Sequence, residues 1–280
     1  MNKNNKVWFV TGASKGLGLT LVKRLLSEGH QVAATSRNKS ALIDAVGSQS
    51  ENFLPVEVSL SSEASLKAAV DLTLSHFKTI DVLVNNAGYG QGGAVEEVTD
   101  SEARKNFEVN VFGLLNVTRA VLPVMRKNKS GHVFNISSVG GYVGAFSGWG
   151  VYCATKFAVS ALTEGLHADV KDLGINVTLV YPGYFRTNFL DKESMMSPSN
   201  QIEDYKSAKE SMDYHKQTIN GNQPGDPEKA AMVMIELTEV PNPPLHFFMG
   251  SDAVAMAEQK IESVTADIKE WKKTSTSTDF

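Results

Sequence analysis

Tyr152 and Lys156, in the segment VYCATKFAV, are the side chains best placed to do chemistry, because they stand four positions apart at the start of a helical stretch. In a helix this spacing places both side chains on one face, within reach of a common ligand. A free tyrosine has a pKa of about 10 and is a poor base at neutral pH. A nearby ammonium group and a positively charged cofactor ring favour the phenolate, so Tyr152 could take up or release an alcohol proton. Such a pair also arises by chance in many helices, so its weight depends on other segments.

Two further polar positions favour the same chemistry. Ser137 and Ser138, in NISSVGG, end an apolar run, where ligands bind in open α/β sheets. A hydroxyl there can orient a substrate oxygen towards Tyr152, and the following SVGG favours Ser138 over Ser137. Asn110 interrupts an apolar helical stretch, where it either relays protons through water or bonds only to backbone groups.

The segment TGASKGLG follows the first apolar run and precedes an amphipathic stretch, LTLVKRLLSEG. Gly12 permits a tight turn, Gly16 lets backbone N–H groups approach a pyrophosphate, and Gly18 allows close packing of helix on strand. The start of the helix adds partial positive charge. The glycine spacing differs from the general dinucleotide fingerprint, so the strand–turn–helix context carries the prediction. The expected cofactor loop also includes Ser14, Lys15 and Leu17.

The end of the second apolar run, ATSRN, predicts which dinucleotide binds. An acid at this point would hold the ribose 2′-OH of NAD, whereas an arginine accommodates the 2′-phosphate of NADP. Here Ser36 is followed by Arg37, no acid is present, and Lys15 adds a second cation. A planar guanidinium suits a phosphate, so the sequence favours NADP(H) unless these cations are solvated surface charges.

Short apolar runs alternate with amphipathic stretches along the chain, which is typical of a parallel sheet covered by helices on both faces. We therefore expect an α/β protein, a single-domain Rossmann fold over residues 1–273 with a doubly wound, seven-stranded parallel sheet. Thr99 with Glu102 predicts a helix start, and so does Asp226 before Pro227. The predicted strands are residues 6–10, 31–35, 53–57, 81–85, 132–136, 175–180 and 246–250.

Two segments fall outside this alternation. Residues 184–223 are far longer than a typical connection of ~2–6 residues, and their aromatic and methionine side chains predict a substrate lid; a floppy surface insertion is the alternative. Apolar residues then recur at spacings of three and four, predicting an extra helix at about 251–272 that packs on the body. These residues are Ile261, Val264, Ile268 and Trp271. Residues 274–280 are expected to form a disordered tail.

The composition excludes several classes of protein. A net charge of -4 over 280 residues gives no broad basic face for nucleic acid or an anionic membrane. The one cysteine, Cys153, predicts no internal disulfide and is expected to be a packed neighbour of Tyr152. No secretion signal or uncharged span of ~18 apolar residues is found, so a cytoplasmic location is expected. The six histidines show no close ligand pairing, which argues against a metal site.

The ordered motifs TGASKGLG, NNAG, NISS and YCATK resemble those of the short-chain dehydrogenase/reductase family, and the resemblance covers about residues 6–250. The resemblance implies a small-molecule carbonyl or alcohol substrate and a homodimer or homotetramer paired through the helices at 99–127 and 152–173. The long region after the sixth strand and the added helix look like the hydroxysteroid and retinol dehydrogenase branch. In the implied catalytic tetrad the lysine also lowers the tyrosine pKa, and the asparagine anchors a water. Its members here would be Asn110, Ser138, Tyr152 and Lys156.

The resemblance also implies cofactor contacts beyond the glycine loop. Asn86, Ala87 and Gly88 match the family's central-sheet motif, and Pro182, Gly183 and Thr187 match the segment beside the nicotinamide. Glu57 stands where the family usually has aspartate, so the adenine contact is expected from Glu57 or Val58. The gap from Ser138 to Tyr152 is one residue longer than usual, which we place in SGWG and expect to reshape the substrate pocket.

These observations favour an NADP(H)-dependent oxidoreductase that moves hydride between nicotinamide and a carbonyl or alcohol carbon, with Tyr152 as general acid/base. The alternative is a non-catalytic NADP(H)-binding sensor on the same fold. A nucleotide-sugar epimerase would show a different glycine spacing and a larger C-terminal domain.

Overall fold

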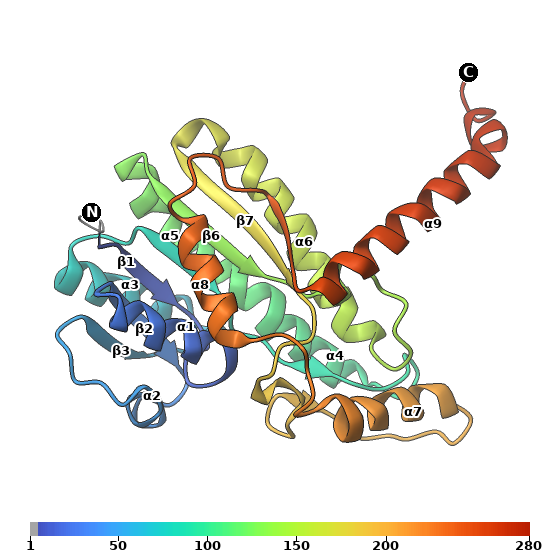
Figure 1. The fold of residues 1–280 in the computed structure, drawn as a ribbon, viewed down its shortest axis with the longest axis horizontal. Coiled ribbons are helices and arrows are strands. Elements are labelled where there is room, and N and C mark those ends of the chain that lie inside the picture. The colour runs from blue at the N-terminus through green and yellow to red at the C-terminus, as the bar shows by residue number, and fades with distance from the viewer. Residues whose placement is uncertain (1–4) are drawn as a thin grey trace.

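In the computed structural model, which describes residues 5–280, one parallel sheet forms the centre of the molecule (Figure 1). Its order is β3-β2-β1-β4-β6-β7-β9. The order reverses between β1 and β4, and ligands bind beside such a point in open α/β sheets. The strands are β1 (Val7–Val10), β2 (Gln31–Ser36), β3 (Phe53–Glu57), β4 (Val82–Asn85), β6 (Gly131–Ile136), β7 (Ile175–Pro182) and β9 (His246–Met249).

All seven predicted strands are confirmed, with ends that differ by at most two residues from those expected. The central strands are apolar on both faces because helices cover both; every residue of β1 is buried. Pro55 lies within β3, which the sheet tolerates because β3 is an edge strand.

Helices pack on both faces of the sheet. One core joins α1 (Gly16–Ser27), α2 (Lys39–Val46) and α8 (Pro227–Leu237) to the sheet. The other joins α3 (Glu63–Phe77), α5 (Gly113–Asn128) and the end of α6 (Gly150–Val170). Both predicted helix starts are confirmed: Thr99 and Glu102 form a capping box on α4 (Asp100–Phe107), and Asp226 caps α8.

A π-helical segment, η1 (Glu108–Phe112), joins α4 to α5, so that one continuous helix runs from Asp100 to Asn128. Among the described residues this helix is long and apolar enough to cross a membrane, by length and composition alone. Core helices pass the same test, and Val117, Val121 and Met125 are buried against the sheet. The feature is therefore weak evidence for a membrane span.

Residues 184–223 contain more regular structure than their polar sequence predicts. The segment holds β8 (Met195–Met196), α7 (Lys206–Tyr214), the π-helical η5 (His215–Ile219) and the 3-10 turn η4 (Asn188–Leu190). β8 pairs in parallel with β5 (Gly90–Gln91), a two-stranded sheet that sequence reasoning missed because each strand has only two residues. Glu97 and Glu102 accept hydrogen bonds of 2.9 Å from the backbone of this segment, which anchors it to residues 90–102.

The C-terminal helix α9 (Ser251–Thr276) is present, but the expectation that it packs on the body along its length is wrong. Only Ala253 and Ala257 are buried, and the helix then extends away from the sheet (Figure 1). Its apolar stripe is exposed. An amphipathic pattern shows that one face of a helix is apolar, but it does not show what covers that face. Residues 274–276, expected in a disordered tail, are helical.

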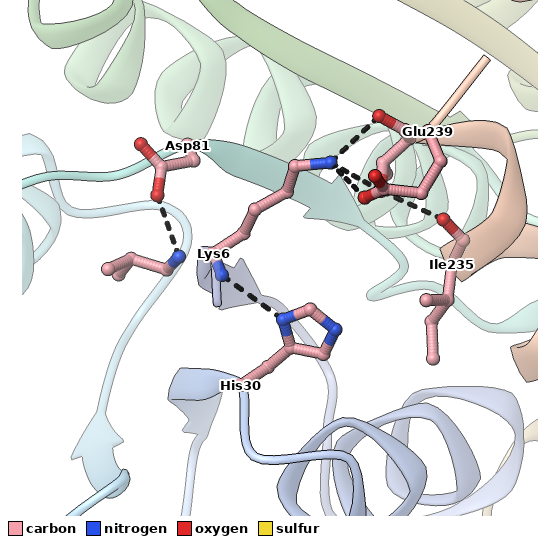
Figure 2. A network of polar contacts seen from close by, with 7 residues as sticks. Lys6, His30, Asp81, Ile235 and Glu239 are labelled. Carbon is pink, nitrogen blue, oxygen red and sulfur yellow. Dashed lines mark hydrogen bonds and ion pairs between the residues drawn. The ribbon is translucent and has the colours of Figure 1, made fainter. Parts of the chain in front are cut away.

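Lys6 ties the start of β1 to two other elements (Figure 2). Its ammonium group donates a 2.8 Å hydrogen bond to the Thr238 carbonyl at the end of α8 and forms an ion pair with Glu239. Its backbone N–H donates to His30 Nδ1 at 3.1 Å. Asp81, which precedes β4, accepts a 2.8 Å bond from the Val7 N–H. These contacts hold the amino ends of the central strands together, opposite the edge that carries the candidate site.

His132, buried in β6, is expected to make the fold sensitive to acid. Its Nε2 lies 2.9 Å from Thr178 Oγ1, which itself donates to the Pro244 carbonyl, so Nε2 carries the proton of a neutral ring. Burial, and then the charge of Lys6, lowers the pKa of His132 to about 3. In the unfolded chain the His132 ring takes up a second proton below about pH 6.5, whereas the folded, buried ring stays neutral. The free energy of unfolding therefore falls as pH drops through that value, by about 2 kcal/mol between pH 7.5 and pH 5.

Urea unfolding at both pH values checks this expectation. In His132→Gln the difference in free energy of unfolding between the two pH values should become small. In His167→Gln, which replaces an exposed histidine, the difference should remain. An unchanged pH dependence in His132→Gln would contradict the assignment.

Candidate active site

A cleft of about 630 Å³ opens at the carboxyl ends of the central strands and continues beneath residues 184–197. It brings together most of the residues that the sequence predicted for the site. Of those, Gly18, Glu57 and Asn110 do not line it. The predicted residues that do are Gly12, Ser14, Lys15, Gly16, Leu17, Ser36, Arg37, Val58, Asn86, Ala87, Gly88, Ser138, Tyr152, Lys156, Pro182, Gly183 and Thr187.

The glycine loop adopts a backbone that side chains would block. Gly12 and Gly16 have φ values of 64° and 58°, in the left-handed region that glycine tolerates. A Cβ on Gly12 would lie 2.7 Å from Ala87 Cα, and one on Gly18 would lie 2.5 Å from Asn86 Nδ2. Gly18 therefore serves close packing rather than lining the cleft. The loop leaves the amino end of α1 facing the cleft, a suitable place for a pyrophosphate.

Asn86 links the ends of β1 and β4. Its side chain donates to the Thr11 and Gly12 carbonyls at 2.9 and 3.1 Å, and its backbone N–H donates to Thr11 Oγ1 at 3.0 Å. This network fixes the glycine loop beside Gly88, where the chain borders the cleft.

Two cations border the cleft near the ends of β1 and β2. Arg37 lines it and, within residues 5–280, forms no ion pair. Lys15 lies 3.5 Å from Glu193, an exposed and therefore weak pair. Of the two expected adenine contacts, Val58 lines the cleft and is 3% exposed, whereas Glu57 is exposed outside it. Successive residues of an extended chain face opposite sides, which places Val58 towards the cleft and Glu57 away from it.

Tyr152, Ser138 and Lys156 meet at the inner end of the cleft. Tyr152 is 8% exposed and hydrogen-bonded to Ser138. The Lys156 ammonium group lies 6.0 Å from the centre of the Tyr152 ring and donates a 2.9 Å bond to the Ile136 carbonyl. The Ser137 hydroxyl instead donates to the Lys156 carbonyl at 3.0 Å, facing α6, so Ser138 is the serine that reaches Tyr152.

Asn110 lies one layer behind this group, in the π-helical segment η1. Its Oδ1 accepts from the Tyr89 N–H at 3.0 Å, and its Nδ2 donates to the Tyr89 carbonyl and to Thr155 Oγ1. A Cβ on Gly88 would lie 3.1 Å from Asn110 Oδ1 and 3.5 Å from Lys156 Nζ, so the amide and the ammonium group are neighbours. π-bulges within α-helices occur frequently at functional sites.

Burial dominates the electrostatics of the site. It raises the pKa of Tyr152 well above 10, an effect that the hydrogen bond with Ser138 partly offsets. Burial also lowers the pKa of Lys156 to about 8, which leaves the group mainly protonated at neutral pH. Cys153 is packed and stays a thiol, because burial raises its pKa to about 11. Among residues 5–280 no group of three or more His, Cys, Asp or Glu could hold a metal ion.

Aromatic side chains surround the part of the cleft next to Tyr152. Phe146 and Trp149 come from the loop with the extra residue, and Phe189 comes from the segment after β7. The Trp149 ring centre lies 6.0 Å from that of Tyr152 and 4.8 Å from that of His215. Sequence reasoning missed His215, because it lies 63 residues from Tyr152 and no local motif marks it.

Comparison with known proteins matches residues 6–197 to the short chain dehydrogenase family model. The chain is 33% identical to the oxidoreductase BOA17 of Botryotinia fuckeliana, over 96% of this chain and 98% of the relative. A short-chain dehydrogenase from Streptomyces avermitilis has a similar structure, with a TM-score of 0.88 and 38% identity over 98% of this chain and 100% of that one.

A further solved structure bears on the cofactor. A short chain dehydrogenase from Burkholderia cenocepacia, in complex with NADP, superimposes with a TM-score of 0.73 and 26% identity over 95% of this chain and 97% of that one. The matched family model agrees with two features of the structure: the strand–glycine loop–helix unit and the cluster of Ser138, Tyr152 and Lys156. This chain therefore belongs to the short-chain dehydrogenase/reductase family of nicotinamide-dependent oxidoreductases.

Proposed function

We propose that this protein is an NADP(H)-dependent oxidoreductase acting on a carbonyl or secondary alcohol carbon, with Tyr152 as general acid/base. The observation that carries the proposal is the meeting of Tyr152, Ser138 and Lys156 in a cleft that also contains the glycine loop. A glycine-rich binding loop alone would suit many nucleotides. A buried phenol held by a serine and a lysine beside it suits proton exchange with an oxygen.

The residues present fit a dinucleotide phosphate. Gly12, Gly16 and the start of α1 would hold the pyrophosphate, and Arg37 with Lys15 would hold a 2′-phosphate. Val58 would lie against the adenine, and Pro182, Gly183 and Thr187 would lie beside the nicotinamide. When bound, the cofactor supplies or accepts the hydride.

The chain's own residues would manage the proton. Ser138 would donate a hydrogen bond that orients the substrate oxygen. Because burial raises its pKa, Tyr152 is protonated at neutral pH and ready to donate its phenolic proton to a carbonyl oxygen. Lys156 would stabilise the resulting phenolate, and Asn110 beside it would hold the water through which the proton is replaced.

A consumption assay with NADPH and NADH over ketones, aldehydes, quinones and steroids tests the proposal. We expect NADPH oxidation with at least one class of carbonyl. Tight NADPH binding with no oxidation of NADPH by any carbonyl would favour the alternative, a sensor that keeps the fold without the chemistry.

We also propose that residues 184–223 act as a substrate lid and that the protein is a cytoplasmic homo-oligomer. The lid proposal rests on Phe189, Met196 and His215, which line the cleft from that segment. The oligomer proposal rests on Phe112 and Phe157, which are 50% and 42% exposed beside α5 and on α6. Large apolar side chains of this kind are typical of subunit interfaces.

A further inference from the structure

A tyrosine–histidine pair borders the cleft beside its aromatic wall. Tyr184, which follows β7, donates a 2.9 Å hydrogen bond from its hydroxyl to Nε2 of His215 in η5. The direction of this bond follows from the other ring nitrogen. His215 Nδ1 lies 2.7 Å from the Ser211 carbonyl, which can only accept, so Nδ1 carries the proton of the neutral ring and Nε2 accepts.

The pair is held in one arrangement. His215 is 8% exposed and packs against Trp149, and both members line the cleft. Burial, and then the charge of Asp252, raises the pKa of Tyr184 to about 12, so its phenol stays neutral. Since its proton is committed to His215, the Tyr184 oxygen can offer a ligand only its lone pairs.

We propose that Tyr184, oriented by His215, is a recognition site that accepts a hydrogen bond from a hydroxyl or N–H group on an uncharged, largely apolar carbonyl substrate. The inference deepens the proposed function and rests on it. The Trp149 ring packs against both Tyr152 and His215, so the two phenols border the same part of the cleft and one compact substrate could reach both. The aromatic wall of Phe146, Trp149 and Phe189 disfavours charged substrates.

Bicyclic ketones of suitable length provide the test: 1-tetralone and its 5-, 6- and 7-hydroxy derivatives. For the wild type we expect at least one hydroxytetralone to exceed 1-tetralone in kcat/KM by about 10- to 100-fold, the usual value of a hydrogen bond in a site built for it. In Tyr184→Phe this ratio should fall to about one. Tyr214→Phe is the matched control, because Tyr214 is an exposed neighbour of His215 outside the cleft lining.

Binding to the NADP⁺ complex, measured by calorimetry, separates the two claims. Tyr184-dependent binding of a hydroxytetralone with no turnover of any carbonyl would support the recognition site and contradict the proposed oxidoreductase. Turnover of carbonyls with the same ratio in wild type and Tyr184→Phe would overturn the recognition site alone. It is also overturned if the wild type neither binds nor reduces a hydroxytetralone in preference to 1-tetralone.

A different observation concerns α9. Every residue of α9 from Glu258 onwards is exposed, and the large apolar side chains in this part of the helix form one stripe, Ile261, Val264, Ile268 and Trp271. Ile268 is 62% exposed and Trp271 56%. The spacings of three, four and three residues place them at alternating a and d positions of a heptad, the seam of a coiled coil. In proteins most of the stability of a helix comes from the packing of its amphipathic face against a partner.

The charges beside the stripe indicate which partner fits. With Ile261 and Ile268 at a, Asp267 is at g and Lys272 is at e. In a parallel pair of identical helices each Asp267 faces Lys272 of the other copy, and no like charges meet. An antiparallel pair would place the two Asp267 side chains together.

We infer that α9 pairs with α9 of a second copy of this chain as a short parallel coiled coil with a twofold axis. Two heptads give a weak contact, so this pairing adds to the interface proposed for α5 and α6. It requires nothing of the active site.

Sedimentation of the full chain over a wide range of concentration tests this pairing. Ile268→Asp should halve the number of chains in the assembly or weaken their association by about 10- to 100-fold, since a charge would enter the seam. Ala266→Asp adds the same charge at the opposite, f position and should leave the mass unchanged. Asp267→Lys should weaken the assembly, and adding Lys272→Asp should restore it. Equal masses for wild type and Ile268→Asp at every concentration would overturn the inference.

Discussion

Tyr152→Phe is expected to lower kcat by about 10³-fold, which is within the usual contribution of a positioned general acid or base. The substitution removes one oxygen from a buried ring that packs against Trp149 and Phe189, so the shape of the site should be retained. With no phenolic proton, the oxygen that forms from the carbonyl can be protonated only by water. Affinity for NADPH should change little, because the phosphate contacts lie at the other end of the cleft.

Steady-state turnover on the best carbonyl, together with calorimetric titration of NADPH, checks both parts of this expectation. Tyr142→Phe provides the control, since Tyr142 packs against Tyr181 and Phe248 and is not in the cleft lining. Wild-type turnover in Tyr152→Phe would remove the acid/base assignment. Lost NADPH affinity would show instead that the variant had damaged the cofactor site.

Arg37→Asp is expected to reverse the choice of nucleotide. The wild type should prefer NADPH, because a guanidinium bound to a 2′-phosphate forms charge-assisted hydrogen bonds worth about 1.5–3 kcal/mol. In the variant a carboxylate would repel that phosphate and could accept the 2′-OH of NADH. The ratio of kcat/KM for NADPH over NADH should therefore fall by at least about 100-fold.

The measurement is kcat/KM for each cofactor at a saturating level of carbonyl. Lys39→Asp makes the same charge change on an exposed residue outside the cleft lining and should leave the ratio almost unchanged. Equal use of both cofactors by the wild type would refute the preference for NADP(H). A ratio that changes equally in both variants would show that net charge, rather than a contact at Arg37, sets the preference.

The proposed recognition site at Tyr184 is distinct from the site of proton transfer at Tyr152. Tyr152 and Tyr184 are both buried phenols, yet their partners differ. Tyr152 has a serine and a lysine nearby, a setting in which its proton can be exchanged. Tyr184 donates to His215 and is held neutral. Substitution of Tyr152 should lower turnover of every carbonyl, whereas substitution of Tyr184 should change only which carbonyls are preferred.

The sequence by itself determined the sheet, the glycine loop and the Tyr152–Lys156 pair. These features depend on local physics: alternation of apolar runs, glycines where φ is positive, and two side chains one helical turn apart. Asn86 follows the same rule, because it comes directly after β4 and bonds to the neighbouring end of β1. Each of these features could be predicted because its partners lie near in the chain or at an adjacent strand end.

Only the tertiary structure decided the features whose partners are distant in sequence. It put Val58 rather than Glu57 in the cleft and turned His215 towards Tyr184, and it brought Ser138, which the sequence had favoured, next to Tyr152. It also left the stripe on α9 uncovered, although its spacing predicted a packed helix. Amphipathic periodicity shows which face of an element is apolar, but long-range packing determines what covers that face.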